Sequence, residues 1–192
     1  WWNDGNGGPP RWETFHLVEL RQILERGYRA GHRRAVAGLS MGGLGAMYYA
    51  ARSRLFTAAA SFSGAVDPLR DPGSFSSLPP QAWGDPVAQR DIWIAHDPYY
   101  LAAGLRGVKN FIACGNGQPG PFDPPGTGFN SLEYSREQMS LALAGRLSEL
   151  HIPVTTEFYG PGTHSWPYWQ RDLHHAFPML MSAIGAHPGG SA

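Results

Sequence analysis

The pentapeptide Gly38-Leu39-Ser40-Met41-Gly42 constrains this chain more than any other feature. The apolar run before it, 35–37, has the pattern of a buried strand, and the stretch 40–51 has that of an apolar helix opening on glycines. A G-x-S-x-G between a strand and a helix puts its serine on a tight turn, with the hydroxyl projecting into a cleft. The pentapeptide alone is common by chance, so the flanking elements carry the prediction that Ser40 is a nucleophile.

The same turn predicts part of the machinery that stabilises negative charge. A helix that starts directly after Ser40 would aim its first backbone N–H groups and the positive end of its dipole at a developing oxyanion. The N–H of Met41 is therefore the expected first donor of an oxyanion hole. The alternative is a glycine-rich turn that carries an incidental serine.

Strands and helices alternate along the rest of the chain. The apolar pattern predicts further strands at 56–62, 108–114 and 154–159, and helices at 11–26, 132–150 and 173–184, with Pro178 interrupting or kinking the last helix. The stretches 1–5, 7–10, 64–98 and 115–130, rich in glycine or proline for the most part, have the pattern of loops. The alternation predicts an α/β fold, a mostly parallel sheet with helices on both faces.

Composition narrows the classes of function. The 15 basic and 15 acidic side chains cancel, so no charge excess indicates a nucleic-acid partner or an anionic membrane surface. No run approaches the ~20 apolar residues of a membrane span. Cys114 is the only cysteine, which excludes an internal disulfide. A metal site at His164, His174 and His175 is not favoured, because no carboxylate or cysteine falls at ligand spacing. We expect no metal and no cofactor.

His164 is the predicted general base. In α/β-hydrolases the triad follows the chain order serine, acid, histidine, with the histidine on a loop after the last strand. Among the eight histidines, His164 alone has this placement, directly after the strand predicted at 154–159. An imidazole there could take the serine proton and return it to a leaving group. The alternative is a loop histidine packed among Trp166, Tyr168 and Trp169.

The acid of such a triad should lie between the strand at 108–114 and His164. Glu149 near the end of a helix and Glu157 inside a strand are poorly placed for this role. Three candidates fit equally well by spacing: Asp123, Glu133 and Glu137. Carboxylates also suit the start of a helix for electrostatic reasons, which is the structural explanation for the two glutamates.

Four stretches, in order along the chain, resemble the esterase-D/antigen 85 group of α/β-hydrolases, whose best-known members are mycobacterial mycolyltransferases. They are Trp12-Glu13-Thr14-Phe15, Gly38-Leu39-Ser40-Met41-Gly42, Cys114-Gly115-Asn116-Gly117 and Gly162-Thr163-His164-Ser165-Trp166-Pro167-Tyr168-Trp169. The likeness spans residues 12–180. It selects Glu133 as the acid, because Leu132-Glu133 matches a Leu-Glu step that precedes the family's histidine. It also supports Met41 as an oxyanion donor and a buried strand-end role for Cys114. Leu39 and Trp166 are the expected substrate-binding residues.

The resemblance implies a serine carboxylesterase that acts through an acyl-enzyme on a small-molecule or glycolipid ester. One alternative is an acyltransferase of mycolyltransferase type, which moves an acyl chain to a sugar hydroxyl. Another is a non-catalytic binding or scaffold protein, or an inactive fragment of the fold. A secreted or cell-envelope location is also implied.

Enzymes of this family carry a further stretch before the equivalent of Trp1, which supplies several strands and the second oxyanion donor. We therefore expect residues 1–192 to form a single α/β-hydrolase domain that is incomplete at its N-terminus. The strand before Ser40 would then lack a neighbour on one side. An unpaired strand edge of this kind predicts poor solubility or pairing with another chain.

Overall fold

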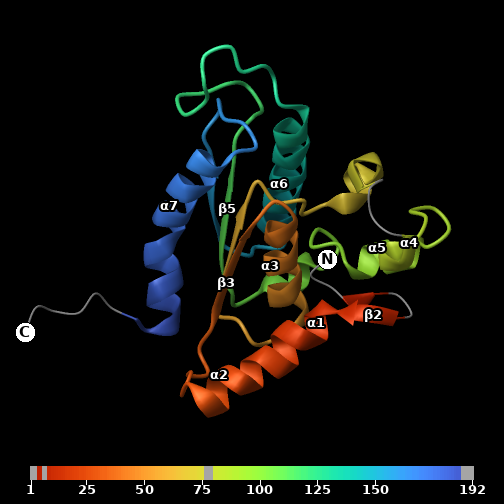
Figure 1. The fold of residues 1–192 in the computed structure, drawn as a ribbon, viewed down its shortest axis with the longest axis vertical. Coiled ribbons are helices and arrows are strands. Elements are labelled where there is room, and N and C mark those ends of the chain that lie inside the picture. The colour runs from red at the N-terminus through yellow and green to blue at the C-terminus, as the bar shows by residue number, and fades with distance from the viewer. Residues whose placement is uncertain (1–3, 6–7, 76–79, 187–192) are drawn as a thin grey trace, which may run out of the picture.

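A computed structural model describes residues 4–5, 8–75 and 80–186. Its centre is a four-stranded sheet with helices on both faces (Figure 1). The strands are β3 (Ala35–Leu39), β4 (Ala58–Phe62), β5 (Lys109–Cys114) and β6 (Val154–Phe158), paired in that order and parallel throughout. The predicted class, an α/β fold with helices on both faces of a parallel sheet, is confirmed.

The three long helices cover the two faces of the sheet and contribute buried apolar side chains to the core. On one face, α3 (Met41–Arg52) and α6 (Ser131–Glu149) contribute Met47 and Leu143 to a large core cluster. On the other face, α7 (Trp166–Ile184) contributes Trp169 and Leu180. All five positions of β4 are buried, and the three alanines at 58–60 leave room for helices on both sides. A strand covered on both faces is apolar along its whole length, as β4 is apart from one serine.

The N-terminal region differs from the expectation of loop at 1–5 and 7–10. There β1 (Asp4–Gly5) and β2 (Gly8–Arg11) form an antiparallel pair. The Asp4 carboxylate accepts from the backbone N–H and the hydroxyl of Thr14, which ties the pair to the following helix. The apolar pattern of a sequence does not reveal a polar tertiary contact of this kind. The loop prediction was wrong here for that reason. Residues 1–3 and 6–7 of those predicted loops lie outside the described residues.

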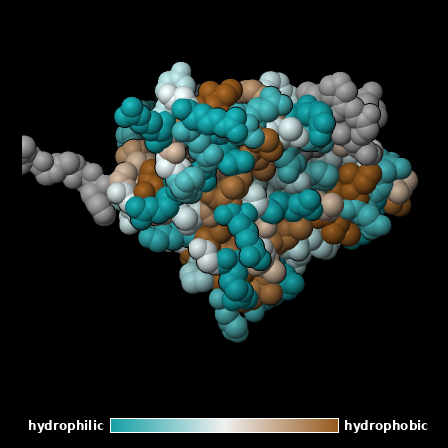
Figure 2. Space-filling model, turned by 90° about the horizontal axis from the view of Figure 1, so that it is seen from below, coloured by the Kyte–Doolittle hydropathy of each residue, from teal (hydrophilic) through white to brown (hydrophobic). Residues whose placement is uncertain are grey.

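The helix expected at 11–26 is present as three consecutive pieces. They are α1 (Trp12–Thr14), the π-helical η1 (Phe15–Leu20) and α2 (Arg21–Gly27). Much of the apolar face predicted for this segment is solvent-exposed, including Val18, Ile23 and Leu24. Viewed from below, on the side where α2 lies, hydrophobic side chains break the polar surface in several places (Figure 2).

The stretch 64–98 is not the loop that its glycines and prolines predict. It contains η2 (Pro68–Arg70), η3 (Pro72–Phe75), α4 (Pro80–Trp83) and α5 (Arg90–Ala95), and η4 (Ala102–Leu105) follows. Three of these elements begin with proline, which is preorganised for a first helical turn. Phe75, Trp83 and Trp93 pack against one another in the core. Residues 76–79 lie outside the described residues. The loop predicted at 115–130 is confirmed.

The last helix, α7, starts well before the predicted residue 173 and runs through Pro178. Ser165 has extended backbone at the N-cap and Pro167 stands in the first turn, a combination that favours a helix start. Pro178 lies on the exposed side of the helix. The carbonyl of His174, which loses its donor there, belongs to an exposed residue. The helix is not interrupted at Pro178, so that part of the prediction was wrong, whereas a kink there stays a prediction.

Strand β3 forms one edge of the sheet. The N–H of Ser40 donates to Phe62 O at 2.9 Å, so alternate residues along β3 bond to β4. The intervening residues, Ala35, Ala37 and Leu39, turn their N–H and C=O groups to the open side. Among the described residues, no strand pairs with this side of β3. Poor solubility or pairing through this edge stays a prediction, as does a single domain incomplete at its N-terminus.

Asp67 and Asp97 are a buried pair of carboxyl groups among the short helices between residues 68 and 105. We expect this pair to make the free energy of unfolding depend on pH. Asp97 is fully buried, hydrogen-bonds to Asp67, and accepts from the N–H groups of Leu69 and Tyr99. Burial, followed by the charge of Asp67, raises the pKa of Asp97 to about 8. In the unfolded chain an aspartate titrates near ~4. The folded state therefore keeps a proton that the unfolded state releases, and the free energy of unfolding falls as pH rises between these values.

Replacing Asp97 by Asn is expected to weaken this pH dependence, because the amide does not titrate. Thermal unfolding between about pH 6 and about pH 9 checks this, with a smaller fall in Tm for the variant than for the wild type. Asp91→Asn, at an exposed position of α5, is the matched control and should behave as the wild type. Equal falls in all three proteins would contradict the role of Asp97.

Candidate active site

The residues singled out by the sequence lie together at the carboxyl edge of the sheet. Ser40 follows β3, Cys114 ends β5, and His164 lies in the loop after β6. Ser63, which the sequence did not single out, follows β4 at the same edge. In a parallel sheet these ends share one edge, and this is where α/β proteins bind their ligands.

Ser40 occupies the sharp turn expected between β3 and α3. Its backbone is at φ 52° and ψ −118°, a region that non-glycine residues rarely adopt. Its carbonyl accepts from the N–H groups of Leu44 and Ala65, both at 3.2 Å, which helps to hold the turn. Backbone strain stored in this way is common at functional sites.

Two glycines make the close approach of strand and helix possible. A Cβ on Gly38 would lie 2.1 Å from the carbonyl oxygen of Gly42, and one on Gly43 would lie 2.6 Å from Ser61 Oγ. A Cβ on Gly42 would meet nothing within 4 Å. Close packing therefore requires glycine at positions 38 and 43. Gly42, the second glycine of the pentapeptide, is not required for this reason.

Ser40, His164 and Glu133 form a continuous hydrogen-bonded chain. His164 Nε2 lies 2.9 Å from Ser40 Oγ, and His164 Nδ1 lies 2.7 Å from Glu133 Oε2. The His164 side chain is 10% exposed and that of Glu133 is 0% exposed. The structure thus brings together residues that are 31 and 124 positions apart in sequence.

The Glu133 carboxylate is surrounded by donors. Its Oε1 accepts from the Ser63 hydroxyl at 2.7 Å, the Gly115 N–H at 2.8 Å and the Cys114 thiol at 3.3 Å. Its own N–H donates to Asn130 Oδ1 at 2.8 Å, the N-cap of α6. A fully buried carboxylate needs donors of this kind to offset its loss of water.

Three neighbours of Glu133 and His164 have no catalytic role in the sequence prediction. Ser63 has φ 46° and accepts from Trp169 Nε1 at 2.9 Å, and the Trp169 ring meets the His164 ring edge-on with centroids 4.8 Å apart. Ser63 directly follows a buried strand, a position shared with Ser40 that could have identified it. Burial, followed by the Glu133 charge, raises the pKa of Cys114 well above its ordinary value. The buried strand-end position predicted for Cys114 is confirmed.

Met41, Leu39 and Trp166 lie beside this chain of hydrogen bonds. Met41 is the first residue of α3, where backbone N–H groups have no acceptor within the helix. Leu39 and Trp166 line a hollow of about 440 Å³ at the open edge of β3, together with Phe62, Trp169 and Leu173. The hollow is almost entirely apolar, and Trp166 is 72% exposed.

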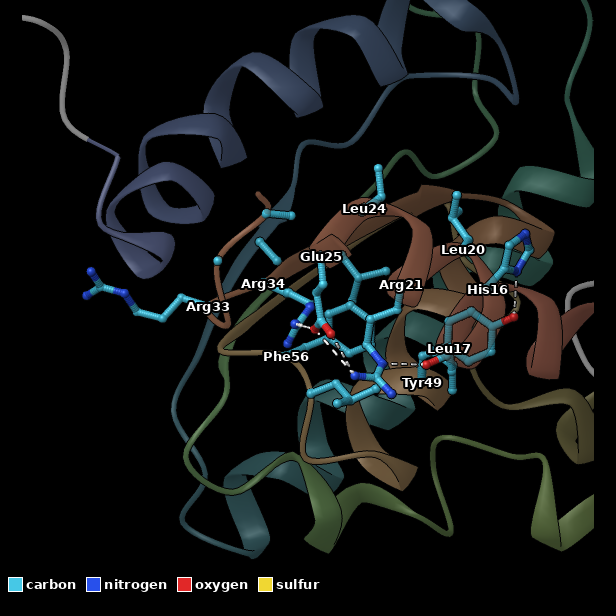
Figure 3. Close-up of a pocket in the computed structure, with 15 residues that line it drawn as sticks. His16, Leu17, Leu20, Arg21, Leu24, Glu25, Arg33, Arg34, Tyr49 and Phe56 are labelled. Carbon is cyan, nitrogen blue, oxygen red and sulfur yellow. Dashed lines mark hydrogen bonds and ion pairs between the residues drawn. The ribbon is translucent and has the colours of Figure 1, made fainter. Parts of the chain in front are cut away.

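A second apolar hollow, of about 460 Å³, lies at the opposite end of β3 (Figure 3). Its main polar groups bind one another. Glu25 accepts from Arg21 at 3.2 Å and from Arg34, and His16 Nδ1 lies 2.9 Å from Tyr49 OH. This hollow is remote from Ser40, so we place the candidate site at the carboxyl edge of the sheet.

The other candidate acids have different partners. Asp123 accepts from Thr163, Tyr168 and the N–H of Gly120. Glu137, one turn along α6 from Glu133, accepts from the side chain of Gln138 at 3.4 Å. Of the three candidate acids that spacing could not separate, Glu133 is the one that hydrogen-bonds to His164 in the described structure.

A parallel sheet covered by helices, with a strained serine turn at its carboxyl edge, defines an α/β-hydrolase. The model of the Esterase family matches residues 3–180, and the chain belongs to this family, which includes the antigen 85 proteins. It is 32% identical over 197 residues to diacylglycerol acyltransferase/mycolyltransferase Ag85B of Mycobacterium intracellulare, covering 94% of this chain and 58% of that protein. The chain thus spans somewhat more than half the length of this curated relative.

Solved structures support the fold. MPT51 of Mycobacterium tuberculosis superposes with a TM-score of 0.75 at 23% identity, covering 91% of this chain and 69% of that one. An S-formylglutathione hydrolase from Agrobacterium tumefaciens gives a TM-score of 0.72 at 20% identity, covering 91% and 58%. Within the part of the chain that the structure describes, no helix has the length and apolar character needed to cross a membrane.

Proposed function

We propose that this chain carries the catalytic centre of a serine carboxylesterase. Ser40 is the nucleophile, His164 the general base, and Glu133 the acid that orients the imidazole. The observation that carries the proposal is the unbroken chain from Ser40 Oγ through His164 to Glu133, with links of 2.9 Å and 2.7 Å. Ester hydrolysis or acyl transfer is also what the family membership favours.

The reaction proceeds through an acyl-enzyme. His164 Nε2 takes the Ser40 proton as Oγ attacks the acyl carbonyl, and Glu133 stabilises the imidazolium that forms. The Met41 N–H donates to the oxyanion. Collapse of the tetrahedral intermediate breaks the ester C–O bond, and His164 returns the proton to the leaving alcohol. Water then attacks the acyl-enzyme by the same steps and releases the carboxylic acid.

The substrate is a small-molecule or glycolipid ester. Its acyl part lies along the apolar hollow that Leu39 and Trp166 line. Transfer of the acyl group to a sugar hydroxyl in place of water is the second candidate, favoured by the name of the relative, a mycolyltransferase. A secreted or cell-envelope location stays a prediction.

A fluorophosphonate probe tests the proposal directly, because it labels only a serine that its surroundings have activated. We expect stoichiometric labelling, located at Ser40 by peptide mass spectrometry. Ser40→Ala should abolish the labelling, whereas Ser148→Ala, at an exposed position of α6, should leave it unchanged. A folded protein that takes up no probe would instead support a non-catalytic binding or scaffold protein.

A further inference from the structure

The loop that carries His164 is held by the loop after β5. The N–H of Asn116 donates to Gly160 O at 2.8 Å, that of Gly117 to Gly162 O at 3.0 Å, and that of Gly162 to Gln118 O at 2.7 Å. The backbones are so close that a Cβ on Gly115 would lie 2.6 Å from Gly162 O. Two loops that are far apart in sequence thus form one seam, which ends just before His164.

Asp123 closes this seam with its side chain. One carboxylate oxygen accepts from the hydroxyl of Thr163, the residue before His164. The other accepts from the Gly120 N–H at 2.8 Å and from Tyr168 OH at 2.7 Å. Burial opposes the charge, but the hydrogen bonds from Thr163, Gly120 and Tyr168 outweigh it and lower the pKa of Asp123. The group is therefore a carboxylate at neutral pH, able to accept from all three.

The partners of Asp123 are themselves well fixed. Thr163 and Tyr168 are both buried. The Tyr168 ring stacks on Tyr159 with centroids 5.8 Å apart and planes 4° from parallel, and the Arg171 guanidinium lies 3.8 Å from the centre of the Tyr159 ring. Through Tyr168 the Asp123 carboxylate is anchored to α7, and through Thr163 it reaches the peptide that precedes His164.

We propose that Asp123 is a positioning residue for His164. By holding the Thr163 hydroxyl, it fixes the peptide from which the His164 ring extends, so that Nε2 and Nδ1 reach Ser40 and Glu133 at the same time. Glu133 fixes the rotation of the imidazole ring through Nδ1. The contact between Thr163 and Asp123 fixes the position of the backbone from which the ring extends. This inference rests on the proposed function, because it concerns the same histidine.

Asp123→Ala is expected to lower kcat for a p-nitrophenyl ester by about 10- to 100-fold, with KM changed by no more than about twofold. The reason is that a small displacement of a catalytic group lowers the rate of the chemical step more than it weakens substrate binding. Asp123→Asn should restore most of kcat, because its amide oxygen can accept from Gly120 and Tyr168 while its NH₂ donates to Thr163.

Thr163→Val provides the second arm and Thr163→Ser its conservative partner. Thr163→Val should match Asp123→Ala, the double variant should be no worse than either single one, and Thr163→Ser should retain activity. Asp85→Ala is the matched control, because Asp85 also accepts from two loop N–H groups, those of Val87 and Ala88, but lies elsewhere. It should leave kcat unchanged.

Circular dichroism establishes that each variant is folded at the assay temperature. A folded Asp123→Ala with wild-type kcat overturns the inference, as does a Thr163→Val variant with wild-type kcat. If Asp123→Ala does not fold, the Thr163 pair decides alone. The proposed function fails separately, if Ser40→Ala keeps the activity of the wild type.

Discussion

Replacing Ser40 by Ala is expected to lower kcat for a p-nitrophenyl ester by at least about 10⁴-fold. The substitution removes the oxygen that forms the acyl bond in the proposed mechanism. It should leave the fold intact, because the Ser40 side chain bonds to His164 while the turn is held by backbone groups. Alanine at this strained φ should change stability little, since it replaces another residue with a Cβ. Steady-state kinetics and a thermal melt together measure the two effects.

The Ser148→Ala variant serves as the control for Ser40→Ala, because it removes an exposed hydroxyl from α6. It should retain the kcat and the Tm of the wild type. Turnover in the Ser40→Ala protein at a rate near that of the wild type would exclude Ser40 as the nucleophile and, with it, the proposed acyl-enzyme.

Replacing Glu133 by Gln is expected to lower kcat by about 10⁴-fold, through the tautomer of His164. The amide oxygen of the substituted side chain would turn to the donors that now bind Oε1, which are Ser63 and Gly115. Its NH₂ would then face His164 Nδ1, which must become the acceptor. The ring proton moves to Nε2, opposite Ser40, and His164 can no longer take the serine proton.

Glu137→Gln is the matched control for this substitution, because it makes the same chemical change one turn further along α6. It should retain kcat. Kinetics on both variants, with circular dichroism to establish folding, check the assignment. Full activity in a folded Glu133→Gln protein would rule out Glu133 as the orienting acid, and a loss confined to Glu137→Gln would reassign that role.

The sequence was informative where the arrangement of the candidate site depends on chain order and local pattern. The Ser40 turn needs a strand, a serine between glycines and a helix, all of which are local. His164 follows from its position after the last strand. The four strands were located to within about two residues because buried strands are short apolar runs.

The sequence was less informative where partners come from distant segments. The choice among Asp123, Glu133 and Glu137 depends on how α6 begins, at the Asn130 cap, and on which side chain then faces the end of β5. Spacing could not decide this, and only the resemblance selected Glu133. The role of Asp123 at the seam depends on two loops meeting in space, which no pattern along the chain records.

The same reasoning explains the errors in the fold. The helices between 68 and 95 are too short for a periodic signal, and buried aromatic side chains fix them in place. The pair of β1 and β2 depends on the contact between Asp4 and Thr14. Pro178 is tolerated because it lies on the exposed side of α7.

The open edge of β3 has a consequence for how activity would be lost. Ser40 stands at the end of an edge strand, whose outer backbone groups bond to no neighbouring strand within the described residues. Strands with fewer hydrogen bonds open at a lower free energy than the centre of a sheet. Local fraying of β3 would carry Ser40 away from His164 while β4, β5 and β6 stay folded. If the proposed site is active, we expect its inactivation to begin at a lower temperature than global unfolding of the described residues.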